Sequence, residues 1–407
     1  MTTDAPAPTI DNLDPRLQRQ SFWASIPQRL QTGPLSLAPV TFGLLLLMGG
    51  FWLKAHTFFG AYNLFNLTQQ VACNWGLIAL GLTLVLLLGE IDLSAGSVSG
   101  LAAAVTAVLS VEHHWGVTLA FVFAILVGAA VGLLQGTLVT TLGLPSFVVT
   151  LAGLLGWNGL MLYVLGSTGN INLGASWLLN LPNDQLPHTM SYFIVAIPPV
   201  LLVVTQLLTR SRRLNAGLSA RSIASIFGVQ ILFLAVLEAL TYYLNSHGQG
   251  VSTVFVVMIV LFAIVDVVLR RTRPGRNLMA VGGNAEAARR AGINVTRVRI
   301  VVFMLCSAFA AAGGIFAMAN LGAVSQSAGG GDVLINSIAA CVIGGVSLFG
   351  GRGMVWGTLV GLFVIGVIQN GFAILGLTTD VQAMITGLVL VAAVVLDGLS
   401  RRGQVKR

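Results

Sequence analysis

A succession of apolar segments, most of them near 20 residues long, runs through almost the whole chain. An α-helix needs about 20 apolar residues to cross the hydrocarbon core of a bilayer, whereas a transmembrane β-barrel shows alternating segments of about 10 residues. The pattern therefore predicts an all-α polytopic integral membrane helical bundle with up to twelve membrane segments. They fall at roughly 36–53, 69–89, 93–111, 117–140, 146–165, 190–209, 223–244, 251–269, 300–321, 333–349, 354–375 and 381–397.

Composition favours a lipid environment. Only 8% of the 407 residues are charged and the mean hydropathy is +0.90, whereas soluble domains carry about 25% charged residues. The net charge of +8 does not indicate a nucleic-acid partner, because apolar segments separate the basic residues and prevent one continuous basic surface. The segments after Asp92 and before Gly350 could each be a half-helix or a re-entrant segment, so ten or eleven full spans remain possible.

The arginines and lysines predict the orientation. With twelve spans, all of them except Lys54 fall on one side of the membrane. The positive-inside rule assigns that side to the cytoplasm. We therefore expect both termini to be cytoplasmic. The expected organisation is a tail over 1–34, a transmembrane domain over 35–399 with a basic cytoplasmic loop over 270–299, and a second tail over 400–407.

Two glycine-rich blocks indicate an internal repeat. GEIDLSAGSVSG at Gly89–Gly100 and GGVSLFGGRGMVWG at Gly344–Gly357 each separate two apolar segments. Each is followed downstream by a similar segment that begins LGL, at Leu142–Gly153 and Leu375–Gly387. The shared order favours duplication of a several-helix unit, and transporters built from repeats place the solute path at the repeat interface. Chance similarity between glycine-rich apolar segments is the alternative.

The first block carries two acidic residues near membrane depth, Glu90 and Asp92. Acids in such places usually face the protein interior or a water-filled cavity, and Gly89 permits a break in the helix there. One interpretation is a structured turn that borders a solute path. The other is an ordinary turn in which Asp92 or Ser94 caps the next helix.

Polar residues inside the apolar segments are further candidates for a solute path. Amides and aromatic rings suit a sugar, which presents hydroxyl groups and apolar ring faces. Each amide could instead serve only as an interhelical hydrogen bond, worth under about 1 kcal/mol. The candidates are Asn74, Trp75, Gln135, Asn158, Gln369 and Asn370.

Enzymatic chemistry and bound cofactors are not expected in this chain. It contains no G-x-x-x-x-G-K-[ST] motif, so if ATP drives transport, another subunit must bind ATP and Mg²⁺. The GSVSG segment at Gly96–Gly100 only approximates the serine-hydrolase elbow, and no histidine lies in an apolar segment. The three cysteines lack metal-ligand spacing and the five histidines are scattered, so no metal site is expected.

The loop 270–299 carries the sharpest local signals. Pro274 and Gly275 are expected to break the preceding helix. Asn284 can cap a short helix over Glu286–Ala291, and Gly292 is placed to end it. A short capped helix on the cytoplasmic face suits docking of a partner, and a solvated amphipathic loop is the alternative.

Four ordered motifs lie between Gly89 and Gly353: GEIDLSAGS at Gly89–Ser97, PSFVVTL at Pro145–Leu151, and the runs Ala280–Ile293 and Ala340–Gly353. Together they resemble the permease subunits of bacterial ABC importers for monosaccharides, the family that includes the ribose, galactose and xylose permeases. The likeness extends over roughly Leu64–Leu396, and the additional segment Arg210–Tyr243 is similar to the xylose type.

This resemblance implies an inner-membrane permease, usually a homodimer, that imports a monosaccharide, with D-xylose the expected solute. It implies two partners: a periplasmic sugar-binding protein and an ABC ATP-binding subunit on the cytoplasmic side. The alternative is a self-sufficient ion-coupled secondary transporter, for which Glu90, Asp92, Glu238 and Asp266 are the only candidate ion ligands. The expected coupling residues are Gly282, Gly283, Asn284, Glu286, Ala287, Arg289 and Gly292.

Overall fold

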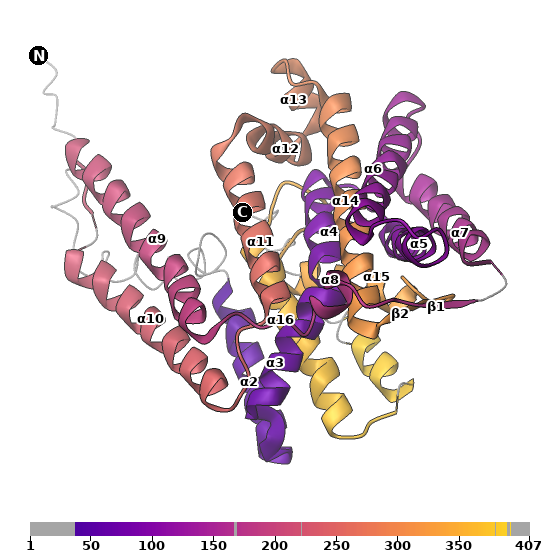
Figure 1. Ribbon diagram of the computed structural model, residues 1–407. Coiled ribbons are helices and arrows are strands. Elements are labelled where there is room, and N and C mark those ends of the chain that lie inside the picture. Colours follow the sequence, from indigo (N-terminus) through magenta and orange to yellow (C-terminus); the bar gives the residue numbers. More distant parts are fainter. Residues whose placement is uncertain (1–36, 167–168, 221, 379, 389–390, 392–407) are drawn as a thin grey trace, which may run out of the picture.

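The computed structural model describes residues 37–166, 169–220, 222–378, 380–388 and 391 (Figure 1). Both expected tails, 1–34 and 400–407, lie outside the described residues. So do residues 389, 390 and 392–397 of the last apolar segment, 381–397.

The described chain is a bundle of helices (Figure 1), so the expected fold class is confirmed. Within the described ranges, nine helices are long and apolar enough to cross a bilayer, and two further apolar helices are shorter. Together they account for the first eleven predicted segments. The long helices are α3–η4–α4 (Ala61–Leu88), α5–η5 (Ala95–Glu112), α6 (Val117–Thr141), α7 (Ser146–Leu165), α9 (His188–Asn215), α10 (Ile223–Ser246), α11 (Thr253–Arg271), α14 (Val295–Leu321) and α16 (Val355–Ile374). The short ones are α2 (Ala38–Lys54) and α15 (Gly331–Ile343).

The remaining elements are small. A 3-10 turn, η3 (His56–Phe59), connects α2 to α3, and a short helix, α8 (Trp177–Asn180), lies between α7 and α9. Strands β1 (Asn170–Asn172) and β2 (Ala323–Ser325) pair antiparallel. Helices α12 (Arg273–Gly283) and α13 (Ala285–Arg290) connect α11 to α14.

Helix α14 lies in the centre of the bundle and packs closely on its neighbours through glycines. A side chain added at Gly132 of α6 would overlap the backbone of Phe303, and one added at Gly314 would overlap the backbone of Ser99 in α5. Small residues let membrane helices approach in this way where no hydrophobic effect drives them together. The close packing holds α4, α5 and α6 around α14.

Helices α9 and α10 form a hairpin that stands away from the bundle (Figure 1). Only 6% of the most apolar 18-residue stretch of α9, and 11% of that of α10, is buried inside the protein. The Tyr243 hydroxyl donates a hydrogen bond to the Phe59 carbonyl at 3.1 Å and ties the end of α10 to the bundle. Between the two ends of the hairpin, its exposed large side chains are mostly apolar and suited to lipid.

The described arginines gather at one end of the bundle. Helices α9 and α11 begin side by side, since the Thr253 amide donates to the Asp184 carbonyl at 3.0 Å. Both helices then run toward the end that carries α12 and α13 and finish in arginines (Figure 1). We call the end that carries α12, α13 and the last turns of α9 and α11 the basic end. The structure therefore has the charge asymmetry that the sequence predicts.

The helix break expected at Pro274 and Gly275 is present, and a new helix begins directly after it. Helix α11 ends earlier, at Arg271, and Thr272 caps a new helix by accepting a hydrogen bond from the Gly275 amide at 3.4 Å. Proline is tolerated in a first helical turn because its missing N–H has no partner there. Pro274 therefore lies in the first turn of α12, just after the end of α11.

Candidate functional site

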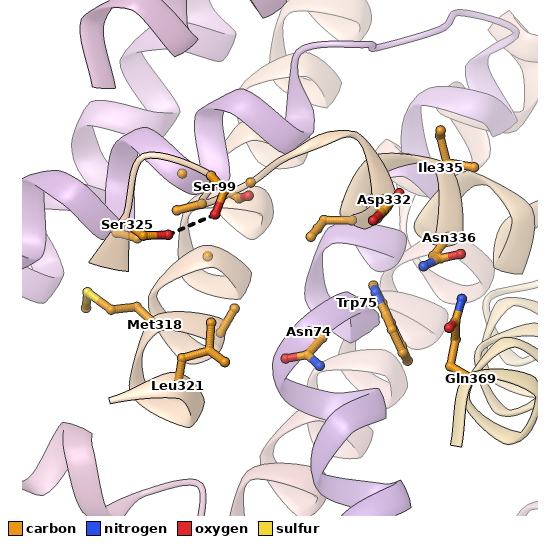
Figure 2. A pocket seen from close by; sticks show the side chains of 18 of the residues that line it. Asn74, Trp75, Ser99, Met318, Leu321, Ser325, Asp332, Ile335, Asn336 and Gln369 are labelled. Carbon is orange, nitrogen blue, oxygen red and sulfur yellow. Dashed lines mark hydrogen bonds between the residues drawn. The ribbon is translucent and has the colours of Figure 1, made fainter. Parts of the chain in front are cut away.

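A cavity of about 510 Å³ lies in the bundle. Several of the elements that line it, among them α15 and β2, lie toward the end opposite α12 and α13 (Figure 1). It is bounded by η4, α5, the C-terminal part of α14, the loop after β2, α15, α16 and residues 382–387. Its polar side is formed by Asn74, Trp75, Asp332, Asn336 and Gln369, and Met318 and Leu321 of α14 lie across from them (Figure 2).

A π-helical segment, η4 (Val71–Gly76), presents two of these residues. It interrupts the long helix Ala61–Leu88, and such segments are frequent at functional sites because they re-aim side chains within a helix. A side chain at Gly76 would overlap Met258 of α11, so glycine permits the close contact on the far side of the segment. Asn74 and Trp75 are thereby directed into the cavity.

The start of α15 supplies the carboxylate of the cavity. Asp332 lies in the first turn of this helix, where the helix dipole favours a negative charge. Asn336 follows one turn later on the same face, and it is 5% exposed. These two side chains therefore line the cavity one above the other (Figure 2).

Hydrogen bonds orient the other cavity amides. The Asn74 Oδ1 accepts from the Asn320 Nδ2 at 3.4 Å, and the Gln369 Nε2 donates to the Thr386 hydroxyl at 3.3 Å. An amide group can make four hydrogen bonds in all. Each side chain is thus held in place with further donors and acceptors that can serve a polar ligand.

Three of the nine expected path residues line the cavity: Asn74, Trp75 and Gln369. Sequence reasoning missed the acidic Asp332, although the rule that singled out Glu90 and Asp92 applies equally to an acid at the start of an apolar segment. The other polar lining residues that it missed are Ser99, Ser325, Ser327, Asn336, Gln382 and Thr386.

Asp92, Ser94 and Gln135 form a separate buried network. Asp92 is 1% exposed, and its Oδ1 accepts from the Ser94 amide at 2.8 Å and from the Ser94 hydroxyl at 2.7 Å. The Gln135 Nε2 of α6 donates to the Ser94 hydroxyl at 2.9 Å. Because Ser94 makes no side-chain cap on α5, the network instead ties the break between α4 and α5 to α6.

The remaining expected path residues also lie elsewhere. Glu90 forms an ion pair with Arg299 of α14 at 3.0 Å. Asn370 and Asn63 exchange two side-chain hydrogen bonds of 2.9 Å, which join α16 to α3. Asn158 is exposed on the outer face of α7.

The expected capped helix in the loop after α11 is present as α13. The Asn284 Oδ1 accepts from the Ala287 amide at 2.9 Å, and Gly292 follows the helix with a φ of +82°. Glu286 forms ion pairs of 3.2 Å with Arg289 and Arg290. All three charged side chains are more than half exposed, so this face of α13 is available to a partner.

Four glycines bring α12 against both glycine-rich blocks, and we call this contact the glycine junction: Gly89, Gly282, Gly350 and Gly351. The Gly351 amide donates to the Leu87 carbonyl at 2.9 Å. A side chain at Gly282 would overlap that same carbonyl, and one at Gly350 would come within 2.8 Å of the Gly89 backbone. The two blocks therefore lie side by side beneath α12, whereas their duplication stays a prediction.

Comparison with known proteins assigns the chain to a family. A family model described as "Branched-chain amino acid transport system / permease component" matches residues 63–394. The chain belongs to this permease family. The match includes the cavity, the buried network and the glycine junction, so these features all belong to the permease domain.

Several curated relatives of the permease are similar over most of their length. The xylose transport system permease protein XylH of Escherichia coli (strain K12) is 33% identical over 351 residues, which cover 86% of this chain and 88% of the relative. The ribose import permease protein RbsC of the same strain is 31% identical over 341 residues, or 84% and 87%. The fructose import permease protein FrcC of Rhizobium meliloti is 31% identical over 384 residues, or 94% and 88%.

These relatives confirm the resemblance to monosaccharide permeases and give no support to an ion-coupled secondary transporter. No solved structure matches the permease.

Proposed function

We propose that this permease is the membrane-spanning subunit of an ATP-driven monosaccharide importer, with D-xylose as the first candidate solute. The cavity carries the proposal. It combines a tryptophan ring, four amides and one carboxylate in a volume of about 510 Å³, within the usual range for small-molecule sites. The xylose, ribose and fructose permeases among its relatives support the same class of solute.

The chemistry of a monosaccharide matches the two sides of the cavity. Ring C–H groups can pack on the face of Trp75 and against Met318 and Leu321. The hydroxyl groups can donate to Asp332 and exchange hydrogen bonds with the amides of Asn74, Asn336 and Gln369. A solute held in this way gives up its hydration shell without leaving its hydroxyl groups unpaired.

The position of the cavity supports an alternating-access cycle. It lies toward the end opposite the basic end, and the glycine junction and the Glu90–Arg299 ion pair close the bundle between it and α12. With the basic end in the cytoplasm of a bacterium, a periplasmic binding protein would deliver the sugar to the cavity. In this proposal four of the expected path residues hold together the helices that enclose the path: Asp92, Ser94, Gln135 and Asn370.

Energy would enter through α12 and α13. We assign the contact with a separate ABC ATP-binding subunit to Gly282, Gly283, Asn284, Glu286, Ala287, Arg289 and Gly292. Closure of the ATP-binding subunits would push α13, and α12 would pass the displacement through the glycine junction to α4 and to the second block. ATP and Mg²⁺ would bind the partner subunit alone, and two copies of the permease would assemble as a homodimer.

Reconstitution tests this function. The purified permease is placed in proteoliposomes with its ATP-binding subunit and sugar-binding protein, and uptake of radiolabelled D-xylose is measured with and without ATP. We expect ATP-dependent uptake, a loss of about tenfold or more in Trp75→Ala, and near-normal uptake in Trp52→Ala, which removes a tryptophan of α2 outside the cavity. Uptake that needs only a proton or sodium gradient would instead establish a secondary transporter.

A further inference from the structure

The charge of the cavity is negative and comes from one residue. Of the described residues that line it, Asp332 alone is charged, and none is a lysine, arginine or histidine. The amides, hydroxyl groups and the tryptophan of the lining are neutral. A ligand in this cavity therefore meets one carboxylate and no cation that could offset it.

Nothing in the described part of the chain neutralises Asp332. The four ion pairs found there join other residues. The N-terminal dipole of α15 acts on this carboxylate directly, because Asp332 lies in the first helical turn. The same helix terminus is therefore already occupied by a negative charge and is poorly suited to binding the carboxylate or phosphate of a ligand.

From this arrangement we infer that Asp332 sets the charge selectivity of the cavity, admitting neutral polyhydroxylated ligands and excluding anionic ones. The inference rests on the proposed function for the identity of the ligand as a sugar. A neutral sugar offers hydroxyl donors, which the carboxylate accepts. An aldonate, a uronate or a sugar phosphate brings a second negative charge close to this carboxylate, and like charges repel each other.

The inference also separates two classes of solute that the comparisons bring together. The matching family model is described by branched-chain amino acid transport, whereas the curated relatives named above are sugar permeases. An amino acid carries an α-carboxylate, which needs a cation or a free helix N-terminus. The described cavity offers neither, so its lining favours the neutral sugar.

Thiol chemistry measures the selectivity without any need for transport. The three native cysteines are buried, so a cysteine introduced by Ser327→Cys at the cavity wall is the reactive site. The purified full-length permease is treated with the cationic trimethylammonioethyl methanethiosulfonate and, in parallel, with the anionic sulfonatoethyl reagent. Ser246→Cys, at an exposed position at the end of α10, serves as the reporter outside the cavity.

We expect the ratio of cationic to anionic rates to be about tenfold higher at the cavity cysteine than at the reporter on α10. Adding Asp332→Asn should remove that excess, Asp332→Glu should keep it, and neither should change the ratio on α10. Equal ratios at both sites, or a ratio that Asp332→Asn leaves unchanged, would overturn the inference. Elution of each variant as a single species in detergent checks that it is folded.

Protection by sugars tests whether the charge selectivity of the cavity acts on the proposed solute. D-xylose at high concentration should slow modification of the cavity cysteine, D-xylonate should not, and Asp332→Asn should let D-xylonate protect as well. Protection by D-xylonate in the presence of Asp332 would contradict the inference. If the cavity cysteine shows the charge ratio but D-xylose does not protect it, the charge selectivity stands and the proposed sugar path is contradicted.

Discussion

Glu90 and Arg299 form an ion pair in which the Glu90 Oε1 lies 3.0 Å from the Arg299 Nη2, and the two side chains are only 14% and 28% exposed. The pair joins the segment after α4 to the first turns of α14. It lies at the basic end of the bundle, away from the cavity. Its contribution can therefore be measured without disturbing the lining of the path.

Removing one partner of this pair should destabilise the permease. Glu90→Gln leaves the guanidinium of Arg299 largely buried without its carboxylate, and we expect a loss of about 1–3 kcal/mol. Thermal unfolding in detergent measures it as a fall in Tm. Because the uncompensated charge causes the loss, Glu90→Gln with Arg299→Gln should unfold at a higher temperature than the sum of the two single effects predicts. Strict additivity would show that the two side chains do not interact.

The glycine junction makes a sharp prediction for two adjacent glycines. A side chain at Gly282 would overlap the Leu87 carbonyl, whereas one at Gly283 meets nothing within 4 Å. Gly282→Ala should therefore push α12 away from α4 and lower the Tm by several degrees, and Gly283→Ala should leave the Tm nearly unchanged. We also expect Gly282→Ala to reduce ATP-driven uptake about tenfold. Similar Tm values for the two variants would mean that α12 does not contact α4 as described.

Glu286→Lys tests the proposed docking face of α13. The ion pairs of Glu286 with Arg289 and Arg290 are exposed, and exposed pairs contribute about 0–1 kcal/mol, so the variant should fold normally. Its ATP-dependent uptake should nevertheless fall strongly while the ATP-binding subunits still hydrolyse ATP. The matched control is Glu112→Lys, the same reversal of charge on an exposed residue after α5, which should couple normally. Normal uptake by Glu286→Lys would remove this residue from the coupling contact.

The substitution Gly283→Pro is a second test of the proposed coupling segment, α12 and α13. Proline at the last position of α12 would remove the backbone N–H of that residue, which belongs to the helix. We expect α13 to lose its fixed position relative to the glycine junction and uptake to fall at constant ATP hydrolysis. Uptake and hydrolysis that stay coupled in this variant would show that the geometry between α12 and α13 is not required.

The buried network of Asp92 predicts two different responses to substitution. Asp92→Asn can keep the two hydrogen bonds that Oδ1 accepts from Ser94, so we expect a modest effect. Asp92→Ala removes both and should cost about 2–4 kcal/mol, because the Ser94 groups stay buried without their partner. The yield of folded protein and its Tm measure the difference. Asn158→Leu is the contrasting change, since Asn158 is exposed on α7 and the substitution should not lower the Tm.

Local features were the predictable part of this structure. The length of each apolar segment predicts a helix wherever the structure describes one, because lipid leaves the backbone no other way to satisfy its hydrogen bonds. The cap by Asn284 and the end at Gly292 follow from side-chain and backbone preferences within a few residues. The break after Leu88 is likewise local, since Gly89 adopts a φ of +82°.

The cavity could not be assembled from the sequence because its residues meet only through the packing of helices that are distant in the chain. Asn370, an expected path residue, pairs with Asn63 at a separation of 307 positions. Helices surrounded by lipid are apolar on every side, so periodicity does not reveal which face of α16 turns inward. Gln369 and Asn370 are neighbours, yet only Gln369 lines the cavity. In the same way, periodicity along α3 and α4 does not reveal which face Asn74 occupies, because the π-helical segment between them shifts the helical register.

The hairpin of α9 and α10 should tolerate more amino-acid substitutions during evolution than the rest of the bundle. Hydrocarbon tails accept leucine, valine, isoleucine or phenylalanine equally well, so random exchange among these residues in the hairpin should be nearly neutral. The bundle around α14, where glycines meet backbone, leaves no such freedom. A saturation library of the gene should therefore recover many active clones with altered hairpins and few with altered α14 contacts.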